Sequence, residues 1–217
     1  MSVAPIDLYD VAISSHANPD GHRGEIWRVK YADGRDLPLA IARWCSEPDD
    51  ADLELLDRCA DPTLDVGCGP GRLVGALSKA GRSALGVDIA AAAVRLARVT
   101  GAAVVRRSVF ETLPGEGRWG TALLADGNIG IGGEPVALLR RCGDLLAPAG
   151  IVLVELDPPG SPSTSVQVRI EAPQQRSSWF TWAHLAADMI DEPAAAAGLR
   201  RVSSWSTAGR WFACLAR

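Results

Sequence analysis

Residues 64–72, Leu-Asp-Val-Gly-Cys-Gly-Pro-Gly-Arg, constrain the fold of this chain more than any other stretch. A short apolar run, typical of a buried strand, leads into a turn in which every second residue is glycine. Glycine lets the backbone bend tightly and approach a ligand closely. A helix predicted over residues 72–80 would point its free N–H groups back at that ligand. The segment therefore predicts a strand, a ligand-binding turn and a helix.

A second apolar run, residues 84–87, ends in Asp88. An acid at the tip of the next parallel strand is placed to accept hydrogen bonds from the two hydroxyls of a ribose. The glycine spacing is G-x-G-x-G, whereas the dinucleotide fingerprint is G-x-G-x-x-G. Asp65, just ahead of the glycines, would repel a pyrophosphate and suits a ligand with a positively charged amino group. A nicotinamide-dependent oxidoreductase is thus a disfavoured alternative.

Residues 63–97 resemble the cofactor half of the class I S-adenosylmethionine-dependent methyltransferases. Residues 65–71 resemble the first motif of that family, and Gly86-Val87-Asp88 resembles the second. The resemblance implies S-adenosylmethionine as cofactor and S-adenosylhomocysteine as product. Ser108 stands where relatives carry an acid that contacts the adenine amino group, so either Ser108 or the backbone of Val109 would make that contact. The cofactor-binding residues implied in this way are Asp65, Gly67, Cys68, Gly69, Gly71, Asp88, Ile89, Ser108, Val109, Ala125 and Asp126.

From residue 63 onward, apolar strands alternate with helices, which indicates a parallel sheet covered on both faces. The predicted strands are 63–66, 84–87, 103–106, 121–125 and 151–155, and the predicted helices are 72–80, 91–99 and 134–145. Residues 157–178 are predicted as a loop and residues 181–197 as a helix. Two strands, 199–206 and 210–216, match the sixth and the antiparallel seventh strand of the class I methyltransferase fold. We therefore expect an α/β, Rossmann-like fold, with a mostly parallel seven-stranded sheet, an antiparallel last strand and helices on both faces.

The N-terminal part is less regular. We expect a short helix from Ile6, a loop over residues 14–23, a hairpin of residues 27–31 and 37–41 around Asp33-Gly34, and a helix opening near Pro48. In the family that the chain resembles, residues ahead of the first motif cover the cofactor and the substrate. The resemblance thus implies a cover segment at residues 1–60, packed on an S-adenosylmethionine-binding domain at residues 61–217.

The fourth predicted strand ends in residues 125–133, Ala-Asp-Gly-Asn-Ile-Gly-Ile-Gly-Gly, where the family places residues near the transferred methyl group. Asp126 and Asn128 are therefore candidates to orient the methyl acceptor or to take its proton. In the alternative interpretation, Asp126 caps the turn and Asn128 adopts a left-handed conformation. We rank this loop first for substrate contact without assigning a base.

Other polar and aromatic residues carry weaker signals. Residues 157–160, Asp-Pro-Pro-Gly, resemble a motif of enzymes that methylate amino groups of nucleic acid bases, but they follow the fifth strand and lack the aromatic, so we interpret them as a turn. Four of the seven tryptophans lie in the last forty residues and could line an acceptor pocket: Trp179, Trp182, Trp205 and Trp211. The histidines stand alone in the sequence and favour structural or surface roles: His16, His22 and His184.

Composition excludes several classes of protein. The chain has 217 residues, enough for one domain with a sizeable core, and a net charge of −4, which gives no general attraction to nucleic acid or to an anionic membrane. No apolar run approaches the roughly 20 residues that span a bilayer, and residues 1–10 lack the pattern of a signal peptide. Five widely spaced cysteines, without a Cys-x-x-Cys pair, are typical of reduced thiols and predict no metal site. We expect a cytoplasmic monomer or homodimer.

These observations predict an enzyme that transfers a methyl group from S-adenosylmethionine to a small-molecule acceptor, in bacterial secondary or specialised metabolism. Alignment of the reactants and exclusion of water supply most of the catalysis of such a transfer, so the sequence need not show a base. A base is required only where the acceptor is a hydroxyl or a protonated amine. The alternative is a non-catalytic, S-adenosylmethionine-binding or regulatory protein with the same fold, which would bind the cofactor without turnover.

Overall fold

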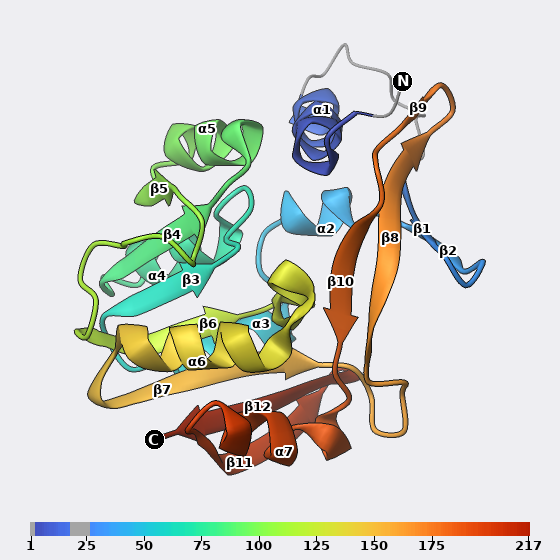
Figure 1. Ribbon diagram of the computed structural model, residues 1–217. Helices are drawn as coiled ribbons and strands as arrows, with labels where there is room; N and C mark the ends of the chain where they lie inside the picture. The colour runs from blue at the N-terminus through green and yellow to red at the C-terminus, as the bar shows by residue number, and fades with distance from the viewer. Residues whose placement is uncertain (1–2, 18–26) are drawn as a thin grey trace.

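The computed structural model describes residues 3–17 and 27–217, and a seven-stranded sheet forms its centre (Figure 1). Five strands run parallel, and the last two form an antiparallel hairpin at one edge. The predicted fold class is therefore confirmed. In spatial order the strands are β11 (Arg200–Thr207), β12 (Arg210–Ala216), β7 (Leu146–Leu156), β6 (Trp119–Leu124), β3 (Thr63–Val66), β4 (Ala84–Asp88) and β5 (Val104–Arg106).

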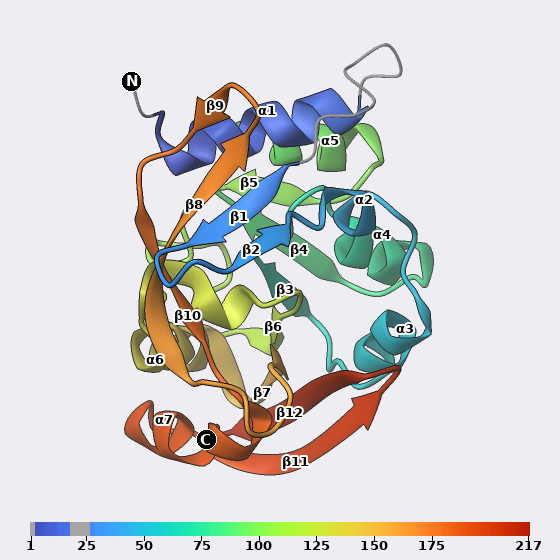
Figure 2. The ribbon, with the colours of Figure 1, turned by 90° about the vertical axis from the view of Figure 1, so that its right-hand side faces the viewer.

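Helices cover both faces of this sheet, because alternate apolar residues of each strand point to opposite sides. Leu64 and Leu124 lie in the cluster that includes the buried residues of α6 (Pro135–Leu145) and α7 (Asp191–Ala196). Leu123 lies instead in the cluster of α3 (Asp50–Asp57) and α4 (Arg72–Lys79). Helix α5 (Ala91–Val99) packs beside α4. Figure 2 shows the two groups of helices on opposite sides of the sheet.

A second, antiparallel sheet lies beyond the carboxyl ends of the parallel strands (Figure 1). Its central strand β1 (Arg28–Tyr31) pairs on one side with β2 (Asp36–Pro38), as the predicted hairpin requires, and on the other with β8 (Thr164–Ala172). Strand β8 also pairs with β10 (Phe180–His184) and with the short β9 (Gln175–Arg176). This sheet therefore joins the N-terminal hairpin to residues 164–184, in front of the edge where parallel sheets bind ligands.

Two helices complete the N-terminal part. Helix α1 (Pro5–Ala17) buries Leu8, Ala12 and Ile13 on one face and lies along α5. Helix α2 is the short segment Ile41–Trp44. Among the residues that the structure describes, every helix is too short or too polar to cross a bilayer.

Four local predictions were wrong. The predicted loop over 14–23 begins as helix, since α1 continues to Ala17; its residues 18–23, including His22, lie outside the described part of the chain. The second hairpin strand ends at Pro38, because residues 41–44 form α2. The predicted loop 157–178 contains β8, whose Val166, Val168 and Ile170 alternate with polar residues. The predicted helix 181–197 is divided into β10, a 3₁₀ turn at Ala187–Met189 and the short α7.

Candidate active site

The glycine turn follows β3 at the carboxyl edge of the central sheet. All three glycines have positive φ angles, +74° for Gly67, +53° for Gly69 and +84° for Gly71, which other residues adopt at a cost. A Cβ on Gly67 would lie 2.8 Å from Nδ2 of Asn128, and one on Gly71 would lie 2.8 Å from Cβ of Ala97. The first glycine thus admits the loop after β6, and the third lets α4 approach α5.

Asp88 is held in place by the turn that it faces. Its carboxylate accepts hydrogen bonds from the backbone N–H groups of Gly69 at 2.9 Å and Ala90 at 2.7 Å. Burial raises the pKa of Asp88, and these two hydrogen bonds oppose that rise. Each carboxylate oxygen keeps acceptor capacity beyond one backbone bond. Asp88 is therefore fixed where it can accept hydrogen bonds from the hydroxyls of a ligand.

Asp65 lies near the end of β3, just before the glycine turn, and is 2% exposed. Burial raises the pKa of its carboxyl group to about 7; Arg72 lowers that pKa, whereas Asp126 and Asp88 raise it further. The negative charge of Asp65 is thus poorly compensated by the protein itself. A ligand that brings a positively charged group to this carboxylate would supply the missing compensation.

An exposed apolar surface adjoins Asp88. Ile89 is 50% exposed and Phe110 is 48% exposed, so Ile89 is a surface residue that offers an apolar contact to a flat ring. Ser108 Oγ accepts a hydrogen bond from the Phe110 backbone N–H at 3.3 Å, which closes the turn after β5. Val109 is buried, and its carbonyl accepts a hydrogen bond from Arg141 at 2.8 Å.

Two more of the predicted cofactor-binding residues turn their side chains into the core. Cys68 is buried in the cluster of α4 and α5, where burial raises the pKa of its thiol well above the usual value. Ala125 is buried in the cluster of α3 and α4. Both residues therefore present only backbone atoms to a ligand.

In the loop after β6, the two residues predicted to orient the methyl acceptor, Asp126 and Asn128, are both held by hydrogen bonds. Asp126 has a φ of +54°, and its carboxylate is bound by Arg43 at 3.1 Å and Arg72 at 2.5 Å. Asn128 Nδ2 donates to the carbonyl oxygens of Val66 and Gly67, both at 2.9 Å. The left-handed residues of this loop are Asp126, Gly127, Gly132 and Gly133, and Asn128 is not among them. The contacts of both candidates favour a role in fixing the loop.

Asp126 belongs to a larger arginine–acid cluster that ties α2, α3 and α4 to the central sheet. At its centre Asp52, 1% exposed, accepts hydrogen bonds from all three arginines of the cluster. Arg210 also forms a bidentate pair with Glu155, with both N–O distances at 2.7 Å. The cluster consists of Arg43, Arg72, Arg210, Asp49, Asp52, Asp126 and Glu155.

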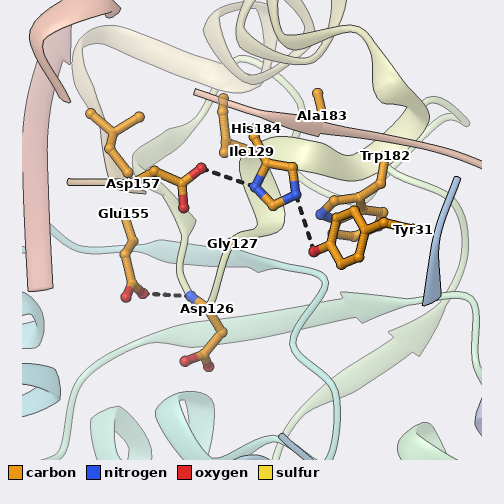
Figure 3. A pocket seen from close by; sticks show the side chains of 10 residues that line it. Tyr31, Asp126, Gly127, Ile129, Glu155, Asp157, Trp182, Ala183 and His184 are labelled. Carbon is orange, nitrogen blue, oxygen red and sulfur yellow. Dashed lines mark hydrogen bonds and ion pairs between the residues drawn. The ribbon is translucent and has the colours of Figure 1, made fainter. Parts of the chain in front are cut away.

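Between the two sheets lies a cavity of about 210 Å³ (Figure 3). The loop after β6 forms one wall, and the ends of β7, β1 and β10 form the others. Its lining residues are Tyr31, Asp126, Gly127, Ile129, Glu155, Leu156, Asp157, Trp182, Ala183 and His184. Of the four C-terminal tryptophans, only Trp182 lines it: Trp205 stacks on Phe212, and Arg169 lies over Trp179.

His184 and Asp157 are the residues that the sequence did not identify. His184 Nδ1 lies 2.9 Å from Asp157 Oδ2, and Nε2 lies 3.2 Å from the hydroxyl of Tyr31. Pro159 and Gly160 form the turn expected there, while Asp157 ahead of them pairs with Ala186 in an isolated bridge. A signal that could have identified this site is that both strands end in a polar aromatic residue, β1 in Tyr31 and β10 in His184.

Residues 63–150 match a protein-family model described as a methyltransferase domain. The solved structures that resemble the chain include the following three, each less than 25% identical to it. No curated protein matches. One resembling structure is a methyltransferase from Bacteroides fragilis in complex with S-adenosylhomocysteine: TM-score 0.80, 19% identity, covering 98% of this chain and 95% of the other.

The second is the 1,6-didemethyltoxoflavin-N1-methyltransferase of Burkholderia thailandensis, with a TM-score of 0.58 and 22% identity over 100% of this chain and 91% of the other. The third, the CcbJ methyltransferase of Streptomyces caelestis, has a TM-score of 0.58 and 17% identity over 76% of this chain and 93% of the other. These likenesses agree with the fold described above.

Proposed function

We propose that this chain, which has the class I methyltransferase fold and a matching methyltransferase domain, transfers the methyl group of S-adenosylmethionine to a small-molecule acceptor. The observation that carries the proposal is the pair of carboxylates on either side of the glycine turn, the buried Asp65 and the half-buried Asp88. S-adenosylmethionine supplies a methyl group that its positively charged sulfur activates for displacement. The protein supplies alignment and exclusion of water.

Asp65 and Asp88 match the two ends of S-adenosylmethionine. Asp65 would bind the ammonium group of the methionine end, which compensates its buried charge. Asp88 would accept hydrogen bonds from the ribose hydroxyls, and Ile89 and Phe110 would contact the adenine ring. Ser108 or the backbone of Val109 would contact the adenine amino group. Gly67, Gly69 and Gly71, with the backbones of Cys68 and Ala125, would leave room for the ligand, and Asp126 would fix the loop beside it.

Residues 1–60 act, in this proposal, as a cover that also includes β8 and β10. The carboxylate of Asp10 on α1 accepts hydrogen bonds from the N–H groups of Ala91 (3.2 Å) and Ala92 (2.7 Å), which open α5. The hydroxyl of Tyr9 lies over the glycine turn, 3.6 Å from where a Cβ of Gly69 would be. The cover thus contacts the turn directly and would exclude water from the bound ligand.

The cavity between the sheets supports a small acceptor. Its volume of about 210 Å³ equals the share of liquid occupied by about seven water molecules. Such a space holds the reacting ring of a small molecule. Two of the similar structures are methyltransferases whose names give 1,6-didemethyltoxoflavin and a glycopeptide as substrates, and they support a place for this chain in bacterial specialised metabolism.

Calorimetry with S-adenosylhomocysteine tests the proposal. Wild type should bind it, and Asp88→Ala should bind it at least about tenfold more weakly, since two charge-assisted hydrogen bonds are worth more than 1.4 kcal/mol. The matched control is Asp57→Ala, an exposed acid at the end of α3. Absence of binding by wild type, or tighter binding of NAD, would contradict the proposal.

A further inference from the structure

Three side chains from different parts of the chain form a line along one wall of the cavity (Figure 3). Asp157 follows β7 of the central sheet, whereas His184 ends β10 and Tyr31 ends β1 of the second sheet. Asp157 and Tyr31 approach opposite nitrogens of the His184 ring, at 2.9 Å and 3.2 Å. The line therefore ends in a hydroxyl group at the cavity wall.

The contacts determine which nitrogen carries the proton. An ionised carboxylate only accepts hydrogen bonds, so Nδ1 of His184 donates to Asp157. The lone pair of neutral imidazole is then on Nε2, where it accepts the hydroxyl hydrogen of Tyr31. Burial raises the pKa of Tyr31, although the Arg35 guanidinium, 4.2 Å above the ring, opposes that rise. The hydroxyl group of Tyr31 thus keeps its proton at neutral pH and holds it towards a base.

This cavity adjoins the glycine turn. Asp126, Gly127 and Ile129 line it, and Asn128, within the same loop, donates hydrogen bonds to the carbonyl groups of Val66 and Gly67 on the opposite side. One loop therefore separates the cavity from the turn at which the methyl donor would bind. A molecule in the cavity would be placed next to that donor.

We propose that Tyr31, His184 and Asp157 form a proton relay that deprotonates the hydroxyl group of a small, planar, uncharged acceptor bound in this cavity. The inference rests on the proposed methyl transfer and adds to it the acceptor class and the base. The acceptor hydroxyl gives its proton to the Tyr31 oxygen, and the Tyr31 proton moves to Nε2 of His184. The acceptor oxygen bonds to the methyl carbon as the bond from that carbon to sulfur breaks. The sulfonium becomes a neutral thioether, and the imidazolium formed is paired with Asp157.

The lining of the cavity indicates this class of acceptor. A built-in base points to an acceptor that must lose a proton, either a hydroxyl group or a protonated amine, and we commit to the hydroxyl group, which the phenol probe below tests. Trp182 and Tyr31 place aromatic rings in the lining, and such rings stack on planar molecules. Among the described lining residues there is no arginine or lysine, while Asp126, Glu155 and Asp157 are acidic. The acceptor would therefore enter in its neutral form, and its anion would be held only beside the imidazolium that the relay forms.

The probe that tests the relay is 4-nitrophenol, whose anion is yellow and whose neutral form is not. It is added to an excess of protein loaded with S-adenosylhomocysteine, at a pH below the pKa of the free phenol. Wild type should turn the probe yellow. Tyr31→Phe and His184→Gln should each reduce the yellow fraction at least about tenfold, the effect of one pKa unit. The matched control, His16→Gln on the exposed end of α1, should behave as wild type.

Asp157 acts through His184 and is tested as a positioning residue. The ¹⁵N chemical shifts of His184 should report a proton on Nδ1 in wild type and a mixture of tautomers in Asp157→Asn, with Asp157→Glu closer to wild type. Wild type that leaves the probe colourless while it binds S-adenosylhomocysteine would overturn the relay and leave the methyl transfer standing. Unchanged colour in either Tyr31→Phe or His184→Gln would also overturn it. A wild type that does not bind S-adenosylhomocysteine would count against the proposed function itself.

Discussion

The side-chain amide of Asn128 donates a hydrogen bond to the carbonyl oxygen of Gly67 at 2.9 Å, and so joins the loop after β6 to the turn after β3. The same nitrogen reaches the carbonyl oxygen of Val66, also at 2.9 Å. Because Gly67 has no Cβ, the amide lies in space that any other residue at position 67 would fill. The turn and the loop are therefore one structural unit, although they lie on separate strands.

Replacing Asn128 should loosen that unit. Asn128→Ala removes both hydrogen bonds and should cost about 1–2 kcal/mol of stability, at roughly 1 kcal/mol for each bond. Asn128→Asp should cost more, because a carboxylate would face two carbonyl oxygens without a proton to donate. Thermal unfolding and calorimetry with S-adenosylhomocysteine would measure both effects. Equal stability of the Ala and Asp variants would argue against these bonds.

Gly67→Ala should abolish cofactor binding and destabilise the fold. The new methyl group would meet Asn128 at 2.8 Å and Ile131 at 2.9 Å, and the φ of +74° is strained for alanine. Gly101→Ala is the matched control, since its φ of +83° is equally strained but nothing lies within 4 Å of the added Cβ. The control should lose only about 1 kcal/mol, the typical cost of the backbone strain. Comparable losses in denaturant unfolding of the two variants would refute the close approach.

Asp65 should make the free protein less stable as the pH rises. Its pKa is about 7 in the folded chain, above its value of 3.8 when unfolded. The folded state therefore binds a proton that the unfolded state releases, and the stability that this proton contributes is lost between about pH 4 and pH 7. Asp65→Asn, which resembles the protonated form, should melt at a higher temperature than wild type near pH 7.5, and the difference should shrink towards pH 4.

The same variant should bind S-adenosylhomocysteine poorly, because it has no charge for the ammonium group. Melting curves of both proteins across this pH range, with and without the ligand, measure the two effects together. A difference in melting temperature that stays constant with pH would show that Asp65 is ionised throughout.

The arginine–acid cluster should stabilise the fold mainly through its buried acid, Asp52. Asp52→Ala leaves three arginines without their shared partner, and breaking such a buried pair costs about 3–5 kcal/mol. The exposed pair of Lys79 and Glu47, with side chains 70% and 83% exposed, provides the control. Glu47→Ala should change stability by less than about 1 kcal/mol. Chemical denaturation of both variants decides whether burial makes the difference.

Ile89→Ala should weaken cofactor binding without loss of stability. The side chain is 50% exposed, so its removal leaves no cavity in the core. If it contacts the adenine ring, affinity for S-adenosylhomocysteine should fall by roughly 1 kcal/mol, about fivefold. Val99→Ala, at 83% exposure on α5, should change neither quantity. A fall in melting temperature with unchanged affinity would assign Ile89 to the core.

Local patterns were sufficient to predict the central sheet. Strand 63–66 and helix 91–99 have their predicted bounds, because apolar runs, glycines and neighbouring turns determine them within a few residues. The pairing of the last two strands was equally visible, since the turn at Ala208-Gly209 lies between two alternating runs. The antiparallel last strand followed from the family resemblance.

The second sheet could not be predicted in this way, since β8 is stabilised by a partner far away in the chain. Val29 pairs with Ile170, and although the residues of β8 alternate between apolar and polar, nothing in the local sequence indicates that distant partner. Prolines and serines around residues 158–164 favoured a loop. His184 and Asp157 were missed for the same reason: their meeting depends on how the two sheets face each other.

The pairing of β1 with β8 also sets an order of events during synthesis. The N-terminal hairpin leaves the ribosome early, but the strand that completes its sheet is made only after β7. Long-range pairing of this kind is slow and leaves strand edges free in the meantime. The central strands and their helices can therefore assemble first. The second sheet, which lies over the carboxyl ends of the parallel strands, is completed only when the last quarter of the chain has been translated.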